Sequence, residues 1–339
     1  MSKTFRILSI DGGGIRGILP GQLLVELEKK LQLISKNPNA RIADYFDMIA
    51  GTSTGGILTC LYLYPDEKSP SRPFFTAQQA VNLYLENGGG IFKESSIRND
   101  EGMRMEKYPV IAIEKLLKKY FKNTRLSELL KPCLITSYNI YSRSTHFFTQ
   151  HDARQSKAYD FYLYDVARGT AAAPTYFEPA GVTSLAGVTY PVVDGGVFAS
   201  NPALCAYAEA RQKFKSGLLE KHRMNMFMLS IGTGSKKESY SYDKSKGWGK
   251  MGWVKPVLDI MLSGASETVD FQMKHIFDSI GCGDNYIRIN PEIGKASIEM
   301  DDASEENLNA LKNAGMAATK KYNEELEKAA SFLIKSGKP

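Results

Sequence analysis

Three short segments of the sequence combine chemically reactive residue types with glycines that can hold them in turns. Residues 51–55 are Gly-Thr-Ser-Thr-Gly, residues 11–17 are Asp-Gly-Gly-Gly-Ile-Arg-Gly, and residues 194–196 are Asp-Gly-Gly. A serine can act as a nucleophile, a carboxylate can act as a general base, and successive backbone amides can hold an anion. Their joint occurrence indicates a site for attack on an acyl ester.

The first segment places Ser53 in a G-x-S-x-G pattern, after the apolar run at residues 45–50 and before a second apolar stretch. This context predicts a nucleophile elbow, in which Gly51 and Gly55 let the backbone pass closely and Ser53 lies at a helix N-terminus. The amides and the positive end of the helix dipole there can stabilise an oxyanion. Short patterns recur by chance, so this motif alone leaves an ordinary turn open.

The glycine run at residues 11–17 has more than one interpretation. Gly12, Gly14 and Gly17 satisfy the G-x-G-x-x-G pattern of dinucleotide sites. Such sites need an acidic residue about 20 positions further on, but there is no Asp or Glu between Glu28 and Asp44. The run therefore indicates a nest of amides suited to an anion, with Arg16 adding positive charge, or simply a tight strand-to-helix turn.

The third segment follows an apolar run and predicts a general base at a strand end. Gly195 and Gly196 would give Asp194 a permissive turn, although Asp-Gly is also a common turn signal. A free aspartate titrates near pH ~3.9, so Asp194 needs burial to raise its pKa and a close hydrogen bond to Ser53.

The rest of the chain supplies the elements that position these motifs. Apolar runs and helical spacing alternate from the start, which predicts an α/β fold with a largely parallel sheet. Strands are predicted at residues 5–10, 133–141, 145–149 and 226–231, and helices at residues 18–34 and 304–335. Residues 88–107 are predicted to form a loop or flap. The helix predicted at 113–130 could lie at a lipid interface, but its pattern favours an apolar face in the core.

In order and separation, the three motifs resemble those of the patatin-like phospholipase family. The segments 43–50, 172–177 and 230–234 agree with the same family. The resemblance extends over residues 5–286 and implies a three-layer α/β/α fold with a mostly parallel central sheet. Residues 287–339 are then expected to be a helical extension packed on the same domain.

The resemblance implies a lipid acyl hydrolase of the phospholipase A or lysophospholipase type, with a Ser53–Asp194 dyad and an acyl-serine intermediate. It places the oxyanion hole at Gly12, Gly13, Gly14 and Arg16, and the supporting turns at Gly17, Gly51, Gly55, Gly195 and Gly196. It implies no metal and no cofactor. Two alternatives stay open: an acyltransferase that uses the same acyl-enzyme, and a lipid- or nucleotide-binding protein with a silent site.

The sequence contains four histidines, and a Ser-Asp-His triad would need one of them. His222 and His275 follow Asp194 in the chain, but their surroundings predict a charged surface run and a helix face, respectively. His146 is predicted in a strand core and His151 in a loop. The family resemblance points to none of them.

Composition and charge give weaker indications about partners. The chain has 339 residues and a net charge of +6, a mild positive balance that suits an anionic membrane surface. Both tryptophans lie among lysines in residues 235–255, which predicts either a headgroup interface or buried indoles. The four cysteines show no metal-like spacing.

These patterns predict a cytoplasmic protein with peripheral membrane contact and no nucleic-acid partner. The first residues lack the pattern of a signal peptide, and the charge-free stretch at 48–65 is too polar for a bilayer span. The expected substrate is a phospholipid or another acyl ester. Whether an activating ligand or protein is needed stays open.

Overall fold

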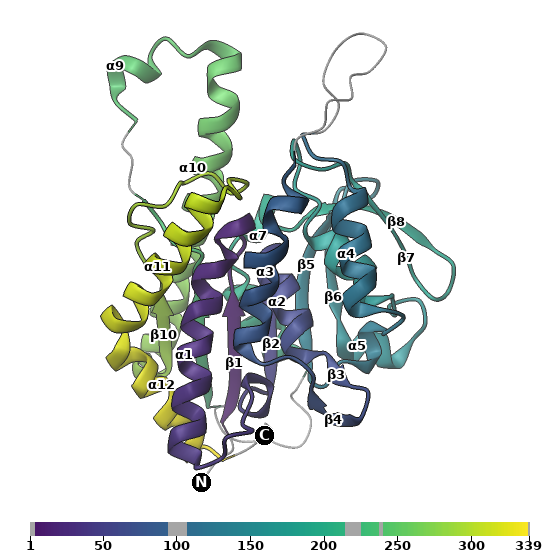
Figure 1. The fold of residues 1–339 in the computed structure, drawn as a ribbon, viewed down its shortest axis with the longest axis vertical. Coiled ribbons are helices and arrows are strands. Elements are labelled where there is room, and N and C mark those ends of the chain that lie inside the picture. Colours follow the sequence, from purple (N-terminus) through teal and green to yellow (C-terminus); the bar gives the residue numbers. More distant parts are fainter. Residues whose placement is uncertain (1–3, 94–106, 214–224, 237–239, 338–339) are drawn as a thin grey trace.

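The computed structural model describes residues 4–93, 107–213, 225–236 and 240–337 (Figure 1). Its centre is an eight-stranded sheet in the order β10-β9-β1-β2-β5-β8-β7, with β6 paired to β5 outside this path. The strands are β1 (Phe5–Ile10), β2 (Met48–Thr52), β5 (Cys133–Asn139), β6 (Ser144–Thr149), β7 (Ala180–Thr183), β8 (Thr189–Asp194), β9 (Met226–Ile231) and β10 (Tyr286–Ile289). A separate hairpin is formed by β3 (Pro65–Asp66) and β4 (Ser69–Pro73).

The helices connect and cover these strands. They are α1 (Ile18–Ser35), α2 (Thr54–Leu63), α3 (Ala77–Ile91), α4 (Ile111–Phe121), α5 (Gln150–Gln155), α6 (Leu163–Thr170), α7 (Gly196–Ala199), α8 (Ala203–Lys213), α9 (Tyr242–Ser245), α10 (Gly249–Ser279), α11 (Glu305–Lys321) and α12 (Asn323–Lys335). Strands β10, β9, β1, β2 and β5 are paired in parallel, whereas β6, β7 and β8 are paired antiparallel. The predicted mostly parallel sheet is therefore confirmed.

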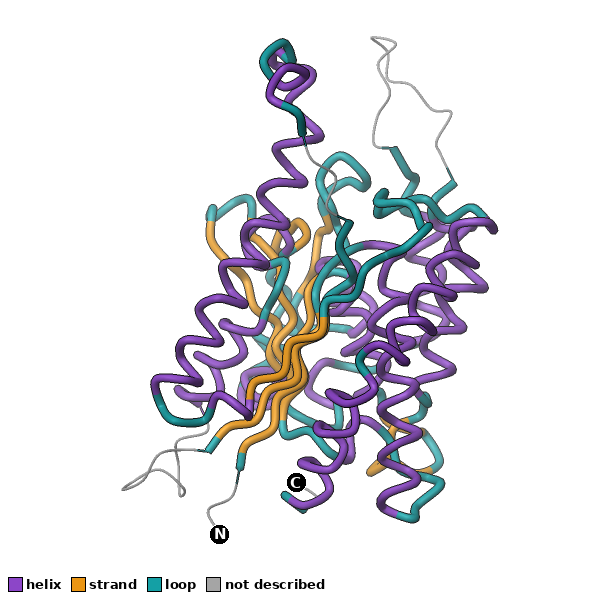
Figure 2. The backbone as a smooth tube through the Cα atoms, turned by 90° about the vertical axis from the view of Figure 1, so that its left-hand side faces the viewer, coloured by secondary structure: helices purple, strands orange, loops and turns teal. Residues whose placement is uncertain are grey.

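Two hydrophobic cores cover the two faces of the sheet, and the alternation of strand residues separates them. Leu8 and Ile10 belong to the larger core, which includes residues of α1, α2, α6, α11 and α12. Ile7, which precedes Leu8 in β1 and points to the other face, belongs to the smaller core with residues of α8 and α10. Figure 2 shows the twisted sheet with helices on both sides. The predicted three-layer α/β/α architecture is confirmed.

The pairing of β5 explains how two distant segments meet. Strand β6 occupies one edge of β5 from Leu134 to Asn139. On the other edge, β2 pairs as far as Thr136, and β8 takes over from the next residue, Ser137, in the opposite direction. The carboxyl ends of β2 and β8 therefore meet along one edge of β5, and Asp194 lies beside the residue that follows β2.

Some predicted elements differ from the observed ones. The predicted C-terminal helix is two helices, α11 and α12, which are separated at Tyr322 and pack against α1. Met316, expected on the apolar face, is half exposed. Residues 88–91 belong to α3 rather than to a loop, while residues 94–106 lie outside the described residues. The division at residues 286/287 stays a prediction.

Helix α4 covers only the first part of the helix predicted at 113–130, and one apolar face of it is buried, as the sequence favoured. Ile113, Leu117 and Phe121 are all buried against the larger core. Within the described ranges, none of the helices combines the length and the apolar character needed to cross a bilayer.

Candidate active site

Ser53 lies at the junction of β2 and α2 with a left-handed backbone, φ 54° and ψ −120°. The left-handed region is uncommon for a residue with a side chain and is the strained geometry expected of a nucleophile elbow. Gly51 and Gly55 make the turn possible, because a Cβ on Gly51 would overlap the Gly55 carbonyl group and a Cβ on Gly55 would overlap the carbonyl group of Ile10. The half-buried serine side chain is thus presented at the carboxyl end of the parallel strands.

Asp194 ends β8, and the Ser53 hydroxyl lies close enough to its carboxylate to lower the pKa of that group. Its Oδ1 also accepts the N–H of Gly196 at 2.7 Å. Burial raises the pKa of Asp194 to about 6, although Ser53 and the Gly196 N–H act in the opposite direction. The structure therefore brings together the two residues that the sequence predicted as nucleophile and base, 141 positions apart in the chain.

The glycine run lies beside Ser53. A Cβ on Gly12 would lie 3.4 Å from the Ser53 Cβ, and only 3.2 Å from the Thr52 Cγ2, so the glycine lets the run pass close to the elbow. The Gly12 N–H donates to the Ser200 carbonyl at 2.9 Å and is thus already engaged. Among the described residues, no acceptor is bonded to the N–H of Gly13 or Gly14. These two amides are the donors that remain for an anion.

The loop is fixed from two sides. Gly14 has φ +58°, and the Met300 carbonyl occupies the place where a Cβ would lie. That same carbonyl accepts the Ile15 N–H at 2.8 Å. Arg16 directs its Nε toward the Gly13 carbonyl at 3.5 Å, and burial lowers the pKa of its guanidinium. The segment around Met300 therefore sets the conformation of the predicted oxyanion loop.

A chain of threonines supports Ser53, and sequence reasoning missed it. Thr170 accepts the Ser53 N–H at 2.9 Å and donates to the Thr136 carbonyl at 2.7 Å. The Thr136 hydroxyl donates to Thr52 at 2.7 Å, which donates to the Ala199 carbonyl at 2.6 Å. This network links four elements around the elbow. The pairing of β2 with β5 brings Thr52 and Thr136 together, and Thr170 joins them from α6, so no local motif identifies these residues.

A buried ion pair anchors the start of the glycine run, and it too was missed. Arg288 of β10 binds both carboxylate oxygens of Asp11, at 2.8 and 2.6 Å. Ser266 of α10 donates to the same carboxylate at 3.1 Å. Burial raises the pKa of Asp11, and the charge of Arg288 opposes this effect. The ion pair links β10 to the start of the glycine run, and the Ser266 hydrogen bond links α10 to the same point.

The described histidines are engaged away from Ser53. His146 packs among the rings of Phe148, Phe161 and Tyr190, and burial lowers its pKa to about 4. His275 is exposed on α10, with its Nδ1 2.8 Å from the Phe271 carbonyl. His222 lies outside the described residues.

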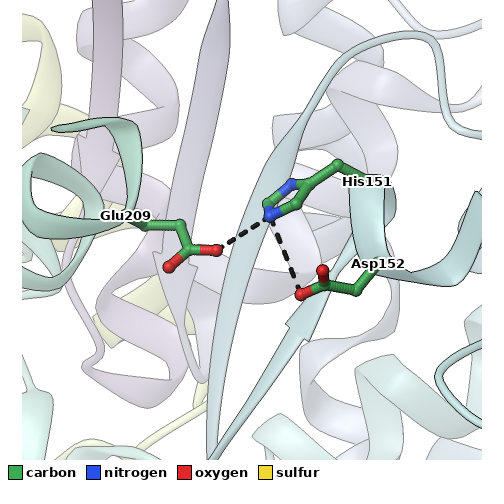
Figure 3. A group of neighbouring side chains, drawn as sticks. All are labelled: His151, Asp152 and Glu209. Carbon is green, nitrogen blue, oxygen red and sulfur yellow. Dashed lines mark hydrogen bonds and ion pairs between the residues drawn. The ribbon is translucent and has the colours of Figure 1, made fainter. Parts of the chain in front are cut away.

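His151 lies on α5 rather than in a loop, and it forms the group drawn in Figure 3. Its Nε2 is 2.8 Å from Glu209 and 3.8 Å from Asp152, a grouping that could hold a metal ion. However, the Asp152 carboxylate already has two partners: the Lys213 ammonium lies 2.9 Å away, and the Thr149 hydroxyl donates to it at 2.7 Å. Because β6 runs antiparallel to β5, the end of β6 lies beside the start of β5. This group therefore lies near the opposite end of the strands from Ser53.

The fold and the site together define a class, the three-layer α/β/α proteins with a serine on a nucleophile elbow. The family model for patatin-like phospholipases matches residues 8–207. Patatin-16 and Patatin group J-1 of Solanum tuberosum are 33% and 34% identical to this chain, covering 98% of it and 90% of their own lengths. The chain therefore belongs to the patatin-like phospholipase family.

Membership of this family supports lipid acyl hydrolase activity, with lipid acyl esters as the substrate class. Among solved structures, VipD from Legionella pneumophila covers 97% of this chain and 67% of its own, with 14% identity and a TM-score of 0.39. That likeness is too distant to inform the site.

Proposed function

We propose that this protein is a phospholipase A or lysophospholipase that cleaves fatty-acyl esters through a Ser53–Asp194 dyad. The observation that carries the proposal is the position of Ser53, on a left-handed elbow, beside a buried carboxylate whose pKa is raised to about 6. A general base works best when its pKa lies near the operating pH. Asp194 is therefore a stronger base than an exposed aspartate, yet it is still ionised at neutral pH.

In the first half-reaction, the Ser53 hydroxyl oxygen attacks the ester carbonyl carbon while its proton passes to Asp194. The carbonyl oxygen becomes an oxyanion, for which the free amides of Gly13 and Gly14 are the proposed donors. Arg16 adds positive field next to this loop. Collapse of the intermediate breaks the bond to the leaving alcohol, which takes the proton from Asp194 and leaves an acyl-serine.

In the second half-reaction, Asp194 takes a proton from water, whose oxygen attacks the acyl-serine carbonyl. Breakdown of the second intermediate releases the fatty acid and returns the proton to Ser53. In this proposal, Gly12 contributes by its missing side chain rather than by its N–H, which Ser200 holds. The turn glycines Gly17, Gly195 and Gly196 keep their proposed supporting roles.

The test measures fatty-acid release from mixed phospholipid vesicles by the full chain and by Ser53→Ala and Asp194→Asn. Release by the wild type that both variants lose supports the dyad. Labelling by a fluorophosphonate probe, absent in Ser53→Ala, reports the nucleophile independently of the substrate. A folded wild type that neither releases fatty acid nor reacts with the probe contradicts the proposal. Transfer of the acyl group to added alcohol in place of release would instead indicate the acyltransferase.

A further inference from the structure

Residues 240–261, comprising α9 and the first part of α10, form a projection that we call the tip. Figures 1 and 2 both show it standing clear of the rest of the molecule. It rises from the end at which β1 and β2 finish, which is also the end that presents Ser53 (Figure 1). Helix α10 has 31 residues and is therefore about 46 Å long, so its first turns extend well beyond the sheet.

One face of α10 within the tip is apolar and exposed. Trp253, Val257, Ile260 and Met261 occupy positions i, i+4, i+7 and i+8, which lie on one side of a helix. Their exposed fractions are 43%, 39%, 45% and 57%. Apolar stripes with this spacing are normally buried, so a stripe open over more than two turns needs a partner.

The opposite face of the same helix is fixed to the protein body. The Leu262 side chain would lie 3.5 Å from a Cβ on Gly196, next to Asp194. Ser266, one turn further on, donates to Asp11 at the start of the glycine run. Asp259 acts electrostatically on Arg16. The stripe is thus held at a defined orientation beside the candidate active site.

The aromatic and lysine side chains of the tip indicate which kind of partner covers the stripe. Tyr240, Trp248 and Trp253 form a ring cluster with centroid distances of 5.2 and 4.9 Å. The exposed Tyr242 carries the Lys246 ammonium 5.8 Å above its ring. Residues 240–261 contain four lysines and two aspartates. Tryptophan, tyrosine and lysine beside an apolar face are the composition of helices that lie in a lipid headgroup region.

We propose that the tip docks on an anionic phospholipid surface, with the stripe Trp253, Val257, Ile260 and Met261 entering the headgroup–acyl boundary. The proposal rests on the proposed function, because the same surface supplies the ester that Ser53 attacks. A docked tip holds the Ser53 end of the sheet against the lipid. The Asp11–Ser266 bond keeps α10 and the glycine run in register in that position.

The chain contains its own reporter for this interaction. Trp248 and Trp253 are its only tryptophans, and both lie in the tip. Intrinsic fluorescence of the full chain carrying Ser53→Ala is measured with phosphatidylcholine vesicles, with and without phosphatidylglycerol. We expect a blue shift and quenching by brominated acyl chains, stronger with the anionic lipid and weakened by salt. An unchanged spectrum at saturating vesicle concentration overturns the proposal.

A matched pair of variants separates the stripe from general surface hydrophobicity. Ile260→Ser/Met261→Ser removes the centre of the stripe, and Leu33→Ser/Met316→Ser removes two side chains that are 79% and 50% exposed on α1 and α11. We expect vesicle partitioning to fall by about tenfold or more in the first variant and to stay at the parental level in the second. Equal partitioning of the two variants contradicts docking through the stripe. Thermal melts of both variants confirm that each is folded.

Failure of docking and failure of the chemistry give different results. Binding is measured in the Ser53→Ala background and does not depend on hydrolysis. In the active chain, Ile260→Ser/Met261→Ser lowers hydrolysis of vesicle lipid relative to hydrolysis of a short soluble ester. No hydrolysis of either ester refutes the dyad and leaves the fluorescence result to decide docking. A concentration-dependent dimer that the same variant abolishes, without any vesicle binding, assigns the stripe to a second copy and overturns the proposal.

Discussion

Asp194→Asn is expected to abolish ester hydrolysis and, at neutral pH, to stabilise the protein. The aspartate is 5% exposed, and burial is the main cause of its raised pKa. Its charged form therefore destabilises the folded state. Asparagine has the same shape, carries no charge, and keeps an oxygen that can accept the Gly196 N–H. The substitution removes the proposed base and the buried charge together.

The size of the stability gain follows from the pKa difference. The group binds a proton with a pKa of about 6 when folded and 3.8 when unfolded. Each unit corresponds to about 1.36 kcal/mol, so ionisation of Asp194 destabilises the fold by about 3 kcal/mol at pH 8. The penalty falls to about 0.5 kcal/mol at pH 4, where the carboxyl is almost fully protonated in the folded state and about 40% protonated in the unfolded state. The free energy of unfolding therefore changes with pH in one direction: the contribution of protonated Asp194 is fully present below pH ~4 and is lost as the pH rises through ~6.

Urea unfolding of wild type and Asp194→Asn at pH 4, 5, 6 and 8 measures this difference directly. Titration of all other groups is shared by the two proteins and cancels in the comparison. We expect the advantage of the variant to grow by about 2 to 3 kcal/mol between pH 4 and pH 8. A difference that does not depend on pH would refute the argument that Asp194 is a buried, destabilised carboxylate. Ser53→Ala is the control, because it removes activity and leaves the buried charge.

Three further predictions follow from individual contacts. With Asp194 as base, kcat/KM for a soluble ester should fall about tenfold per pH unit below pH ~6, and a pH–rate profile that is flat down to pH 5 would contradict this role. Thr170→Val removes the acceptor of the Ser53 N–H and should cost about 1 to 3 kcal/mol in urea unfolding, whereas Thr319→Val on α11, whose half-buried side chain donates to the Met316 carbonyl of the same helix, should cost less than about 0.5 kcal/mol. Arg288→Met leaves the Asp11 carboxylate buried without its partner and should cost about 3 to 5 kcal/mol; an unchanged unfolding midpoint would show that the ion pair is not needed.

The parts of the site that are local in the chain could be predicted from the sequence. The elbow at Ser53 is set in part within its own motif, because a Cβ on Gly51 would overlap the Gly55 carbonyl group and glycine is needed there. The glycine at position 14 is also visible in the sequence, but the Met300 carbonyl group that requires it is distant in the chain. The strands at residues 5–10 and 226–231 were predicted with the observed bounds, since both are short and mainly apolar. The proximity of Asp194 to Ser53 was inferred from the order of motifs rather than from geometry.

The parts that depend on strand pairing were not predictable. Nothing near Thr170 or Arg288 in the sequence marks them as neighbours of Ser53 and Asp11. Arg288 becomes a neighbour of Asp11 because β10 joins the sheet beside β9. Thr170 reaches Ser53 from α6, which packs against α2 and β5. The engagement of the Gly12 N–H by Ser200 has the same origin, since Ser200 follows α7. Sequence patterns specify periodicity and turns, whereas register and edge order require the folded chain.

The stripe on α10 shows why even a correct periodicity leaves function undecided. The spacing of Trp253, Val257, Ile260 and Met261 is visible in the sequence, but the same spacing usually marks a helix face buried in a core. Helix α4 has such a face, and there Ile113 and Leu117 are buried. The two helices differ only in what packs against them, and that depends on the direction in which α10 leaves the sheet. Exposure of an apolar stripe, rather than its presence, is the observation that points to a lipid partner.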